Sequence, residues 1–283
     1  MKIKNQAISL HELGKRANQE DSIYPPGTDS VKTSDLYILC DGMGGHDKGE
    51  VASDCVCKSI GKYIENNPSE VFGTEQFNAA LSAAYDAMDA LDSMDEEKKM
   101  GTTLTFLKFH EEGAFIAHIG DSRIYHIRPS QNSILHVTKD HSLVNELVEL
   151  GELTPEQARQ SSQKNIITKA MQPHQAKRCS ADCLNITDVR EGDYFFLCSD
   201  GVIESMDDGQ LCNIISMNGS DKKKMEIIKS VTKENKDNHS AHLVQVTAVE
   251  ETKGSKKGGI LVFLLVFALI AAFVIAWFVL KIF

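Results

Sequence analysis

Short apolar runs alternate with longer amphipathic stretches along residues 1–250. Runs rich in β-branched and aromatic residues predict strands at residues 36–40, 103–109, 114–119, 124–127, 194–198 and 243–246. The three runs between residues 103 and 127 follow one another with tight connections, which favours antiparallel pairing over a doubly wound parallel sheet.

Helical spacing of apolar residues predicts helices at residues 50–65, 75–93 and 143–150. In the second of these, apolar residues recur every three to four positions with acidic residues between them. A fourth helix is expected to begin at Thr154, because Gln157 completes a capping box and Pro155 occupies the first turn.

The most apolar part of the chain lies at its C-terminal end. Residues 260–280 carry no charged side chain, and the indole of Trp277 is their one hydrogen-bonding side chain. A helix of this length rises about 1.5 Å per residue and would span roughly 31 Å, which matches a hydrocarbon core of about 30 Å. A buried core helix is the weaker interpretation, because such helices rarely lack a polar face. We therefore predict a transmembrane helix at residues 260–280, after a flexible linker at residues 250–259.

The charge distribution bears on both location and partners. Lys253, Lys256 and Lys257 precede the apolar segment and only Lys281 follows it, so the positive-inside rule places residues 1–249 in the cytoplasm. The formal net charge of the chain is −10. A domain this acidic repels phosphate backbones, so no nucleic-acid partner is expected. The seven cysteines lack the paired CxxC spacing of a zinc site and are expected to be reduced.

Aspartates stand where the apolar runs end or begin. Asp41, Asp121 and Asp200 follow the runs that end at residues 40, 119 and 198, and Asp237 precedes the last run. Each therefore sits at the rim of the core, and three of them stand beside a glycine that lets the backbone turn sharply. A single Asp-Gly pair is typical of an ordinary turn, whereas four aspartates so placed indicate a shared site.

Converging carboxylates need a counter-charge. Two carboxylates about 4 Å apart repel by roughly 4 kcal/mol at an effective dielectric of about 20. Either some of them bind protons or a cation lies between them. Oxygen ligands without neighbouring His or Cys ligands favour Mg²⁺ or Mn²⁺ over zinc, and such aspartate clusters are typical of enzymes that hydrolyse phosphate esters.

Six short motifs occur in order between Gly14 and Val249: residues 14–21 (GKRANQED), 41–46 (DGMGGH), 101–103 (GTT), 120–123 (GDSR), 199–201 (SDG) and 237–240 (DNHS). Together they resemble the metal-dependent type 2C (PPM) protein phosphatases in their short bacterial form. The resemblance implies an α+β fold for residues 1–249, an α-β-β-α sandwich of two antiparallel sheets flanked by helices, followed here by one C-terminal transmembrane helix.

The resemblance also implies a set of metal ligands. Asp41 corresponds to the carboxylate that bridges two Mn²⁺ or Mg²⁺ ions, and the carbonyl of Gly42 completes the second site. Asp200 and Asp237 correspond to the remaining protein ligands of the first ion. Asp121, with Asp200, resembles the pair that holds a third, weaker ion in bacterial members.

The remaining roles follow from the same resemblance. Glu20 and Asp21 would hold metal-bound waters, and Arg16 would clamp the substrate phosphate. Many eukaryotic members carry a histidine where this chain has Met43, so a metal-bound water is the expected proton donor to the leaving alkoxide. His46 is the alternative donor, although a loop histidine usually only forms hydrogen bonds.

The implied reaction is hydrolysis of phosphoserine and phosphothreonine by a hydroxide that bridges the two ions, with Asp41 and Arg16 as the residues closest to the chemistry. Residues 145–162 correspond to the family's mobile flap, and Lys169 stands where bacterial relatives usually carry arginine. Phosphorylated proteins, expected to be targets of a Ser/Thr kinase, would be the partners of a monomeric catalytic domain at the cell membrane. Two alternatives stay open, a catalytically degenerate, membrane-tethered phosphoprotein sensor and a phosphatase for small metabolites.

Overall fold

The computed structural model of the 283-residue chain describes residues 1–28, 30–44, 48–92 and 100–251. Contacts divide the chain into two units, Ile3–Val249 and a second unit made of Met1–Lys2 with Glu250–Phe283. The first unit contains the strands and helices predicted from the sequence, except the transmembrane helix.

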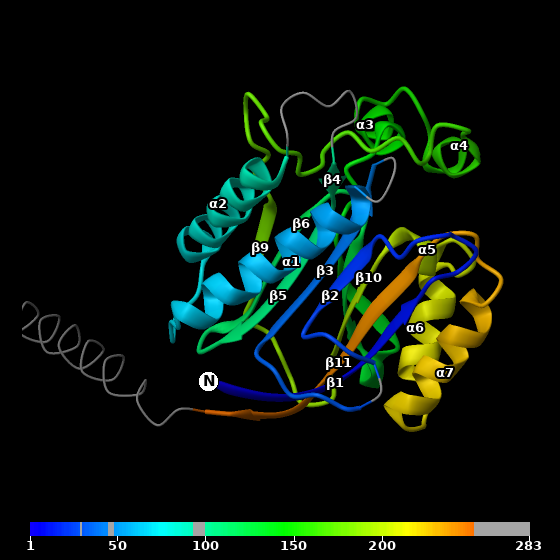
Figure 1. Cartoon of the computed structure of the whole chain (residues 1–283). Coiled ribbons are helices and arrows are strands. Elements are labelled where there is room, and N and C mark those ends of the chain that lie inside the picture. The colour runs from blue at the N-terminus through cyan, green and yellow to red at the C-terminus, as the bar shows by residue number, and fades with distance from the viewer. Residues whose placement is uncertain (29, 45–47, 93–99, 252–283) are drawn as a thin grey trace, which may run out of the picture. The chain divides into compact units, whose positions relative to one another are not determined.

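Two β-sheets form the centre of the first unit (Figure 1). One has the strand order β1 (Lys2–Glu12), β11 (His239–Glu250), β10 (Tyr194–Cys198), β7 (Arg123–Arg128) and β8 (Ser133–Val137). The other has the order β2 (Asp21–Tyr24), β3 (Leu36–Met43), β5 (Leu104–His110), β6 (Gly113–Ile119) and β9 (Asp182–Ile186), with the short β4 (Gly101–Thr102) paired to β3. Neighbouring strands pair antiparallel, for example β10 with both β7 and β11, and β6 with both β5 and β9.

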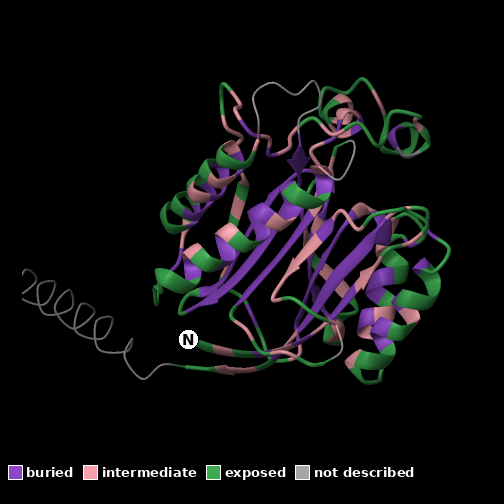
Figure 2. Ribbon diagram, in the orientation of Figure 1, coloured by how far each residue is buried: buried purple, intermediate pink, exposed green. Residues whose placement is uncertain are grey.

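Side-chain alternation along the strands explains why both faces of each sheet are buried. In β10, Tyr194 and Phe196 pack on the helix side of the sheet, whereas Phe195 and Leu197 pack between the two sheets. In the sequence, such strands appear as continuous apolar runs, because neither face of the strand is exposed to water. Figure 2 shows the buried strands, with exposure concentrated on the outer faces of the helices.

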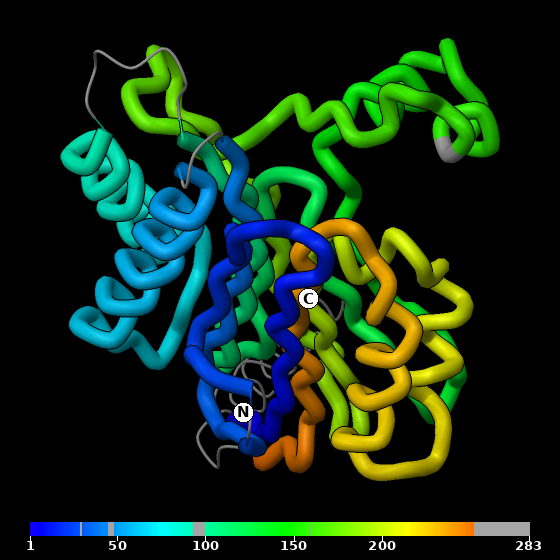
Figure 3. Tube along the Cα trace, turned by 45° about the vertical axis from the view of Figure 1, so that its right-hand side comes forward, coloured from blue at the N-terminus to red at the C-terminus, as the bar shows by residue number. Residues whose placement is uncertain are grey.

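Helices cover the outer face of each sheet. The helices α1 (Lys48–Asn66) and α2 (Thr74–Leu91) pack on the sheet that contains β3, and α5 (Asp200–Ile203), α6 (Asp208–Ser216) and α7 (Asp221–Thr232) pack on the sheet that contains β10. The predicted α-β-β-α sandwich of antiparallel sheets is therefore confirmed. The helices α3 (Leu143–Glu149) and α4 (Pro155–Gln160) lie in a segment that reaches away from both sheets (Figure 3). A short 3₁₀ turn, Pro129–Gln131, links β7 to β8.

Two strand predictions need correction. The run 36–40 continues as β3 through Met43, because Gly42 and Met43 pair with the short strand β4, so Asp41 lies within a strand and not after it. The antiparallel pairing predicted between residues 103 and 127 is confirmed for β5 and β6, but the third run, β7, does not pair with β6: it pairs antiparallel with β8 and β10 in the other sheet. Gly120, with φ +102°, lets the chain turn from one sheet to the other.

The predicted transmembrane helix, residues 260–280, lies outside the described residues, as does most of the linker. Among the helices that the structure describes, none is both long and apolar enough to cross a membrane. The membrane span stays a prediction.

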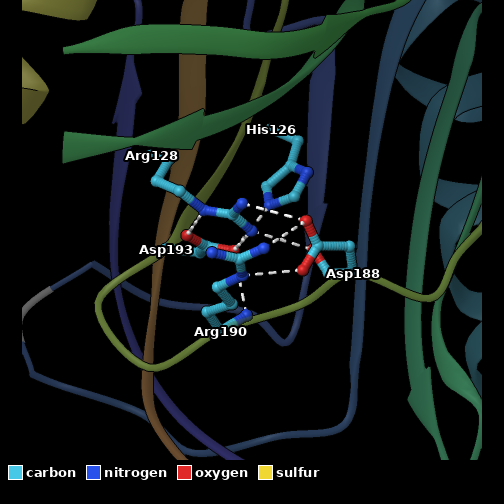
Figure 4. Close-up of polar contacts among 5 residues, drawn as sticks. All are labelled: His126, Arg128, Asp188, Arg190 and Asp193. Carbon is cyan, nitrogen blue, oxygen red and sulfur yellow. Dashed lines mark hydrogen bonds and ion pairs between the residues drawn. The ribbon is translucent and has the colours of Figure 1, made fainter. Parts of the chain in front are cut away.

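A buried ion-pair network fixes the connection between β9 and β10 (Figure 4). The Arg128 guanidinium donates two hydrogen bonds to Asp193, each 2.8 Å long, and His126 Nε2 lies 2.9 Å from Asp193 Oδ2. Arg128 also donates a hydrogen bond to the exposed Asp188, and Arg190 donates another to the same carboxylate. These partners lower the pKa of Asp193 to about 2, although burial alone would raise it.

Replacing Asp193 by asparagine should lower the free energy of unfolding by about 3 kcal/mol, because the buried Arg128 then keeps only the exposed Asp188 as a counter-charge. Asp188→Asn is the matched control and should cost less than about 1 kcal/mol, since that carboxylate is exposed. Because the pKa of Asp193 is depressed, its contribution is present above about pH 4 and is lost as the pH falls through about 2. Urea denaturation of both variants measures the difference, and equal losses would contradict the assignment.

Candidate metal centre

Asp41 and Asp21 occupy directly opposite positions on neighbouring strands. The register of β2 against β3 pairs Asp21 with Asp41, and opposite residues in an antiparallel pair have Cβ atoms about 5 Å apart. Alternation places Asp41 on the same face of β3 as Tyr37, which packs between the sheets. Asp21 is only 3% exposed and Asp41 is half-buried. The two carboxylates therefore meet where the space between the sheets opens to solvent.

The backbone of Asp41 is held by the motif Gly101–Thr103. Thr103 Oγ1 accepts a hydrogen bond from the Asp41 N–H at 3.0 Å, and the Thr103 N–H donates to the Asp41 carbonyl at 2.9 Å. The Thr102 hydroxyl donates to the same carbonyl at 2.9 Å. These bonds satisfy the main chain of Asp41 locally, so its side chain is left for another partner.

Asp200 is brought beside Asp237 by a close backbone approach. Asp200 begins α5 directly after β10. A Cβ atom on Gly201 would lie 2.0 Å from the carbonyl oxygen of Asn238, so only glycine permits this contact. The Asn235 side-chain amide also donates to the Gly201 carbonyl at 2.6 Å.

Asn238 anchors the N-terminal motif against the same site. Its side chain accepts from the Glu20 N–H at 2.8 Å and donates to the carbonyls of Leu13 and Asn18 at 2.8 and 3.0 Å. The loop so held carries Arg16, whose Nη2 donates to Asp237 Oδ2 at 2.6 Å. Half of the Arg16 side chain is exposed, so its other N–H donors remain accessible to a ligand.

Asp121 lies in a turn whose two sides are hydrogen-bonded to Asp140 and His141, which precede the predicted flap. The Gly120 N–H donates to His141 Nδ1 and the His141 N–H donates to the Gly120 carbonyl, both at 3.0 Å. On the other side, Arg123 donates two hydrogen bonds of 2.7 Å to Asp140. Asp121 itself is 8% exposed, so it is a buried carboxylate in a rigid turn.

The clustered carboxylates lack enough protons or cations to balance their negative charge. Burial raises the pKa of Asp21 and of Asp121 to about 7, and burial together with neighbouring acids raises the pKa of Asp41 and Asp200 as well. After burial, the pKa of Asp41 is raised by four acids: Asp21, Asp200, Asp121 and Asp237. Asp21 Oδ1 and Asp121 Oδ1 are buried and find no hydrogen-bond partner among the described residues. Buried oxygens without donors fit divalent-cation ligands, and an all-carboxylate set suits Mn²⁺ or Mg²⁺.

A second cluster has metal-ligand chemistry, but its side chains form hydrogen bonds and ion pairs with other protein groups. His118, His141 and Asp182 offer ligand atoms within 4.8 Å of one another. His141 Nδ1 accepts from Gly120, so the proton of the neutral ring is on Nε2, which faces Asp182 at 3.4 Å. His118 Nε2 likewise donates to a carbonyl, and the ammonium of Lys169 lies 3.0 Å from Asp182. These contacts therefore hold together His141 and Lys169, which flank the predicted flap.

The structure brings together most of the site residues that were predicted from the sequence. The five aspartates and Arg16 surround one region, with Gly42 on β3 beside it. Glu20 has its Oε1 close to Gly49, at the start of α1. His46 lies outside the described residues. No role was predicted for Asn238, although it lies in a recognised motif. Its hydrogen bonds to backbone groups leave no pattern in a single sequence.

Comparison with known proteins gives an independent result. The family model described as Protein phosphatase 2C matches residues 13–246. The protein phosphatase PhpP of Streptococcus pneumoniae is 35% identical over 210 residues, which are 73% of this chain and 82% of that protein. The serine/threonine protein phosphatase PstP of Mycobacterium tuberculosis is 35% identical over 194 residues, or 68% of this chain, but the match spans only 35% of PstP.

A solved structure extends the likeness to three dimensions. The crystal structure of the catalytic domain of PstP in complex with two manganese ions aligns with a TM-score of 0.72 and 28% identity. The alignment covers 87% of this chain and all of that one.

Proposed function

This chain belongs to the protein phosphatase 2C family, and from that membership we propose that it hydrolyses phosphoserine and phosphothreonine in proteins with two Mn²⁺ or Mg²⁺ ions. The observation that carries the proposal is the convergence of aspartates whose pKa values are raised and whose buried oxygens lack donors. Repulsion of this kind is relieved by bound cations. The two manganese ions of the PstP catalytic domain support the same number here.

The assigned ligands follow from position. Asp41 would bridge both ions, with the Gly42 carbonyl at the second and Asp200 and Asp237 at the first. Asp121 would share Asp200 at a third, weaker ion. Glu20 and Asp21 would orient bound waters, and for Asp21 the hydroxyl of Ser199, which donates to its Oδ2 at 2.8 Å, leaves Oδ1 available for that role.

The protein's own groups then bind and orient the phosphate ester. The ions would supply Lewis acidity and an activated water, the bridging hydroxide of the family mechanism. Arg16 offers a planar fork of N–H donors to the phosphoryl oxygens. Met43 has no proton to give, so the leaving alkoxide would take its proton from a metal-bound water, with His46 as the alternative donor.

Residues 260–280 would hold residues 1–249 at the cytoplasmic face of the cell membrane, through the linker 250–259. The length and apolar composition of this segment support a membrane span. The lysines at residues 253, 256 and 257 support an orientation with residues 1–249 in the cytoplasm. Tethering raises the effective concentration of the enzyme near phosphoproteins and Ser/Thr kinases at that surface. No nucleic-acid partner is proposed, and the catalytic unit is taken to act as a monomer.

A tethered phosphoprotein sensor without activity is the alternative, and a phosphatase for small metabolites is a further one. The full set of aspartates favours catalysis, because a degenerate domain has no need to keep carboxylates that destabilise it when cations are absent.

Phosphate release by the full-length chain in detergent distinguishes these functions. We expect Mn²⁺-dependent release from phosphothreonine peptides that stops when EDTA removes the ion and returns when Mn²⁺ is restored. Binding of phosphopeptide without release would favour the sensor. Faster release from sugar phosphates than from any phosphopeptide would favour the metabolite enzyme.

A further inference from the structure

A groove of about 260 Å³ lies between the α1–α2 connection, the β5–β6 turn and β9. Its apolar lining includes the buried rings of Phe72 and Phe115 together with the side chain of Val71. Val71 is 50% exposed, whereas Leu184 lies opposite Ile116 and borders the groove with its backbone, since its side chain is on the other face of the sheet. An exposed apolar side chain beside buried rings in a depression is typical of a binding surface, and this volume suits one or two side chains of a ligand.

The strand that borders the groove has an open edge. In its sheet β9 is the last strand, paired on one side with β6, and no strand in the described part of the chain pairs with its other side. Leu184 and Asn185 of β9 line the groove and are exposed. An open edge offers unpaired backbone N–H and C=O groups to an added strand, while the neighbouring depression receives that strand's side chains.

The rim of the groove is acidic. Glu112 lines the groove, and no lining residue is basic. Glu70 and Glu111 are exposed on the same two connections, and Glu75 is exposed in the first turn of α2. The Glu111 N–H donates to the Glu70 carbonyl at 3.1 Å, which ties the β5–β6 turn to the α1–α2 connection and keeps these acids together. Charge complementarity therefore calls for a basic ligand.

We propose that the groove and the open edge of β9 bind an extended segment of a substrate protein that carries an apolar residue flanked by lysine or arginine. A second copy of this chain fits less well, because it would bring two acidic rims together. The chain's own basic segment, residues 252–259 (TKGSKKGG), has no apolar side chain to fill the groove.

The choice of a substrate protein as the partner rests on the proposed function. The position of the groove also sets the number of residues between the docking segment and the phosphorylated residue. β6 runs from Gly113 beside the groove to Ile119, two residues before Asp121. Seven residues at about 3.3 Å each put the groove roughly 20 Å from the metal centre. The docking segment must therefore be separated from the phosphorylated residue by about six or more extended residues.

Two phosphothreonine peptides test the proposal with the full-length chain and Mn²⁺. Both carry the same phosphorylated site and a ten-residue Gly-Ser spacer, and they end in Lys-Val-Lys-Val-Lys or Lys-Ser-Lys-Ser-Lys. Burial of the valines should raise kcat/KM about tenfold for the first peptide over the second. Val71→Asp should reduce this ratio to about one, whereas Val231→Asp, at the similarly exposed Val231 on α7, should leave it unchanged.

Glu112→Lys lies in an exposed turn and tests the charge without disturbing a strand. It should lower kcat/KM for the valine peptide by about tenfold, whereas the charge-matched Glu226→Lys should not. If the unmodified chain turns over both peptides with equal kcat/KM, the docking site is contradicted. It is also contradicted if the preference for the valine peptide is unchanged in both groove variants. Turnover of neither peptide would instead overturn the proposed function.

Discussion

Asp200→Asn should reduce kcat by about 10³-fold, with the protein still folded. The neutral amide is a weaker ligand than the carboxylate, and Asp200 is assigned to both the first and the third ion. Its place at the start of α5 is fixed by the close approach of Gly201 to Asn238, so the carboxylate is held at the site. The loss corresponds to about 4 kcal/mol of transition-state stabilisation.

Asp54→Asn is the matched control, because it removes the same charge from an exposed position on α1. It should leave both kcat and KM unchanged. Initial rates of phosphate release at saturating phosphopeptide measure both variants, over a range of Mn²⁺ concentrations. Full activity of Asp200→Asn at Mn²⁺ levels that saturate the unmodified enzyme would remove Asp200 from the metal site.

The metal-free protein should lose stability as the pH rises from about 4 to about 7. Asp21 and Asp121 have a folded-state pKa near 7 and an ordinary value of 3.8, so the folded state binds more protons than the unfolded state within that window. Stability falls with pH wherever the folded state holds the extra protons. Mn²⁺ should reverse the trend, because it replaces those protons, and at 1,000 times its dissociation constant it should add about 4 kcal/mol per site.

Urea denaturation at pH 5 and pH 8, in EDTA and in Mn²⁺, measures this dependence, and calorimetry in buffers of different ionisation enthalpy measures the protons released. Without metal, Asp200→Asn should be more stable than the unmodified chain at pH 8, because one repelling charge is gone. Asp54→Asn should leave the pH slope unchanged. A metal-free stability that rises between pH 4 and pH 7 would contradict the account.

The sequence predicted the parts of the fold that depend on continuous apolar runs. The runs at β6 and β10 gave nearly correct strands because both faces of each are buried. The strands β1, β2, β8 and β9 were missed, because each is only partly buried or short and lacks a continuous apolar run. The helices α6 and α7 were missed too, although Asp207 and Ser220 cap them in recognisable positions.

The candidate site was more predictable than the topology around it. Motif order identified the acids, but it did not show that Asp21 faces Asp41 across a strand pair, since β2 itself was not predicted. The change of sheet at Gly120 was also hidden, because a tight turn between two apolar runs is usually a hairpin. The groove beside β9 draws on three segments distant in sequence and left no pattern to detect.

The positions of bound manganese ions would show directly which side chains hold them. Anomalous scattering from crystals of the chain grown with Mn²⁺ should give two strong peaks in contact with Asp41, one of them also in contact with Asp200 and Asp237. Peaks confined to the His118, His141 and Asp182 cluster, or no peak beside Asp41, would contradict the assignment of this aspartate cluster as the metal centre.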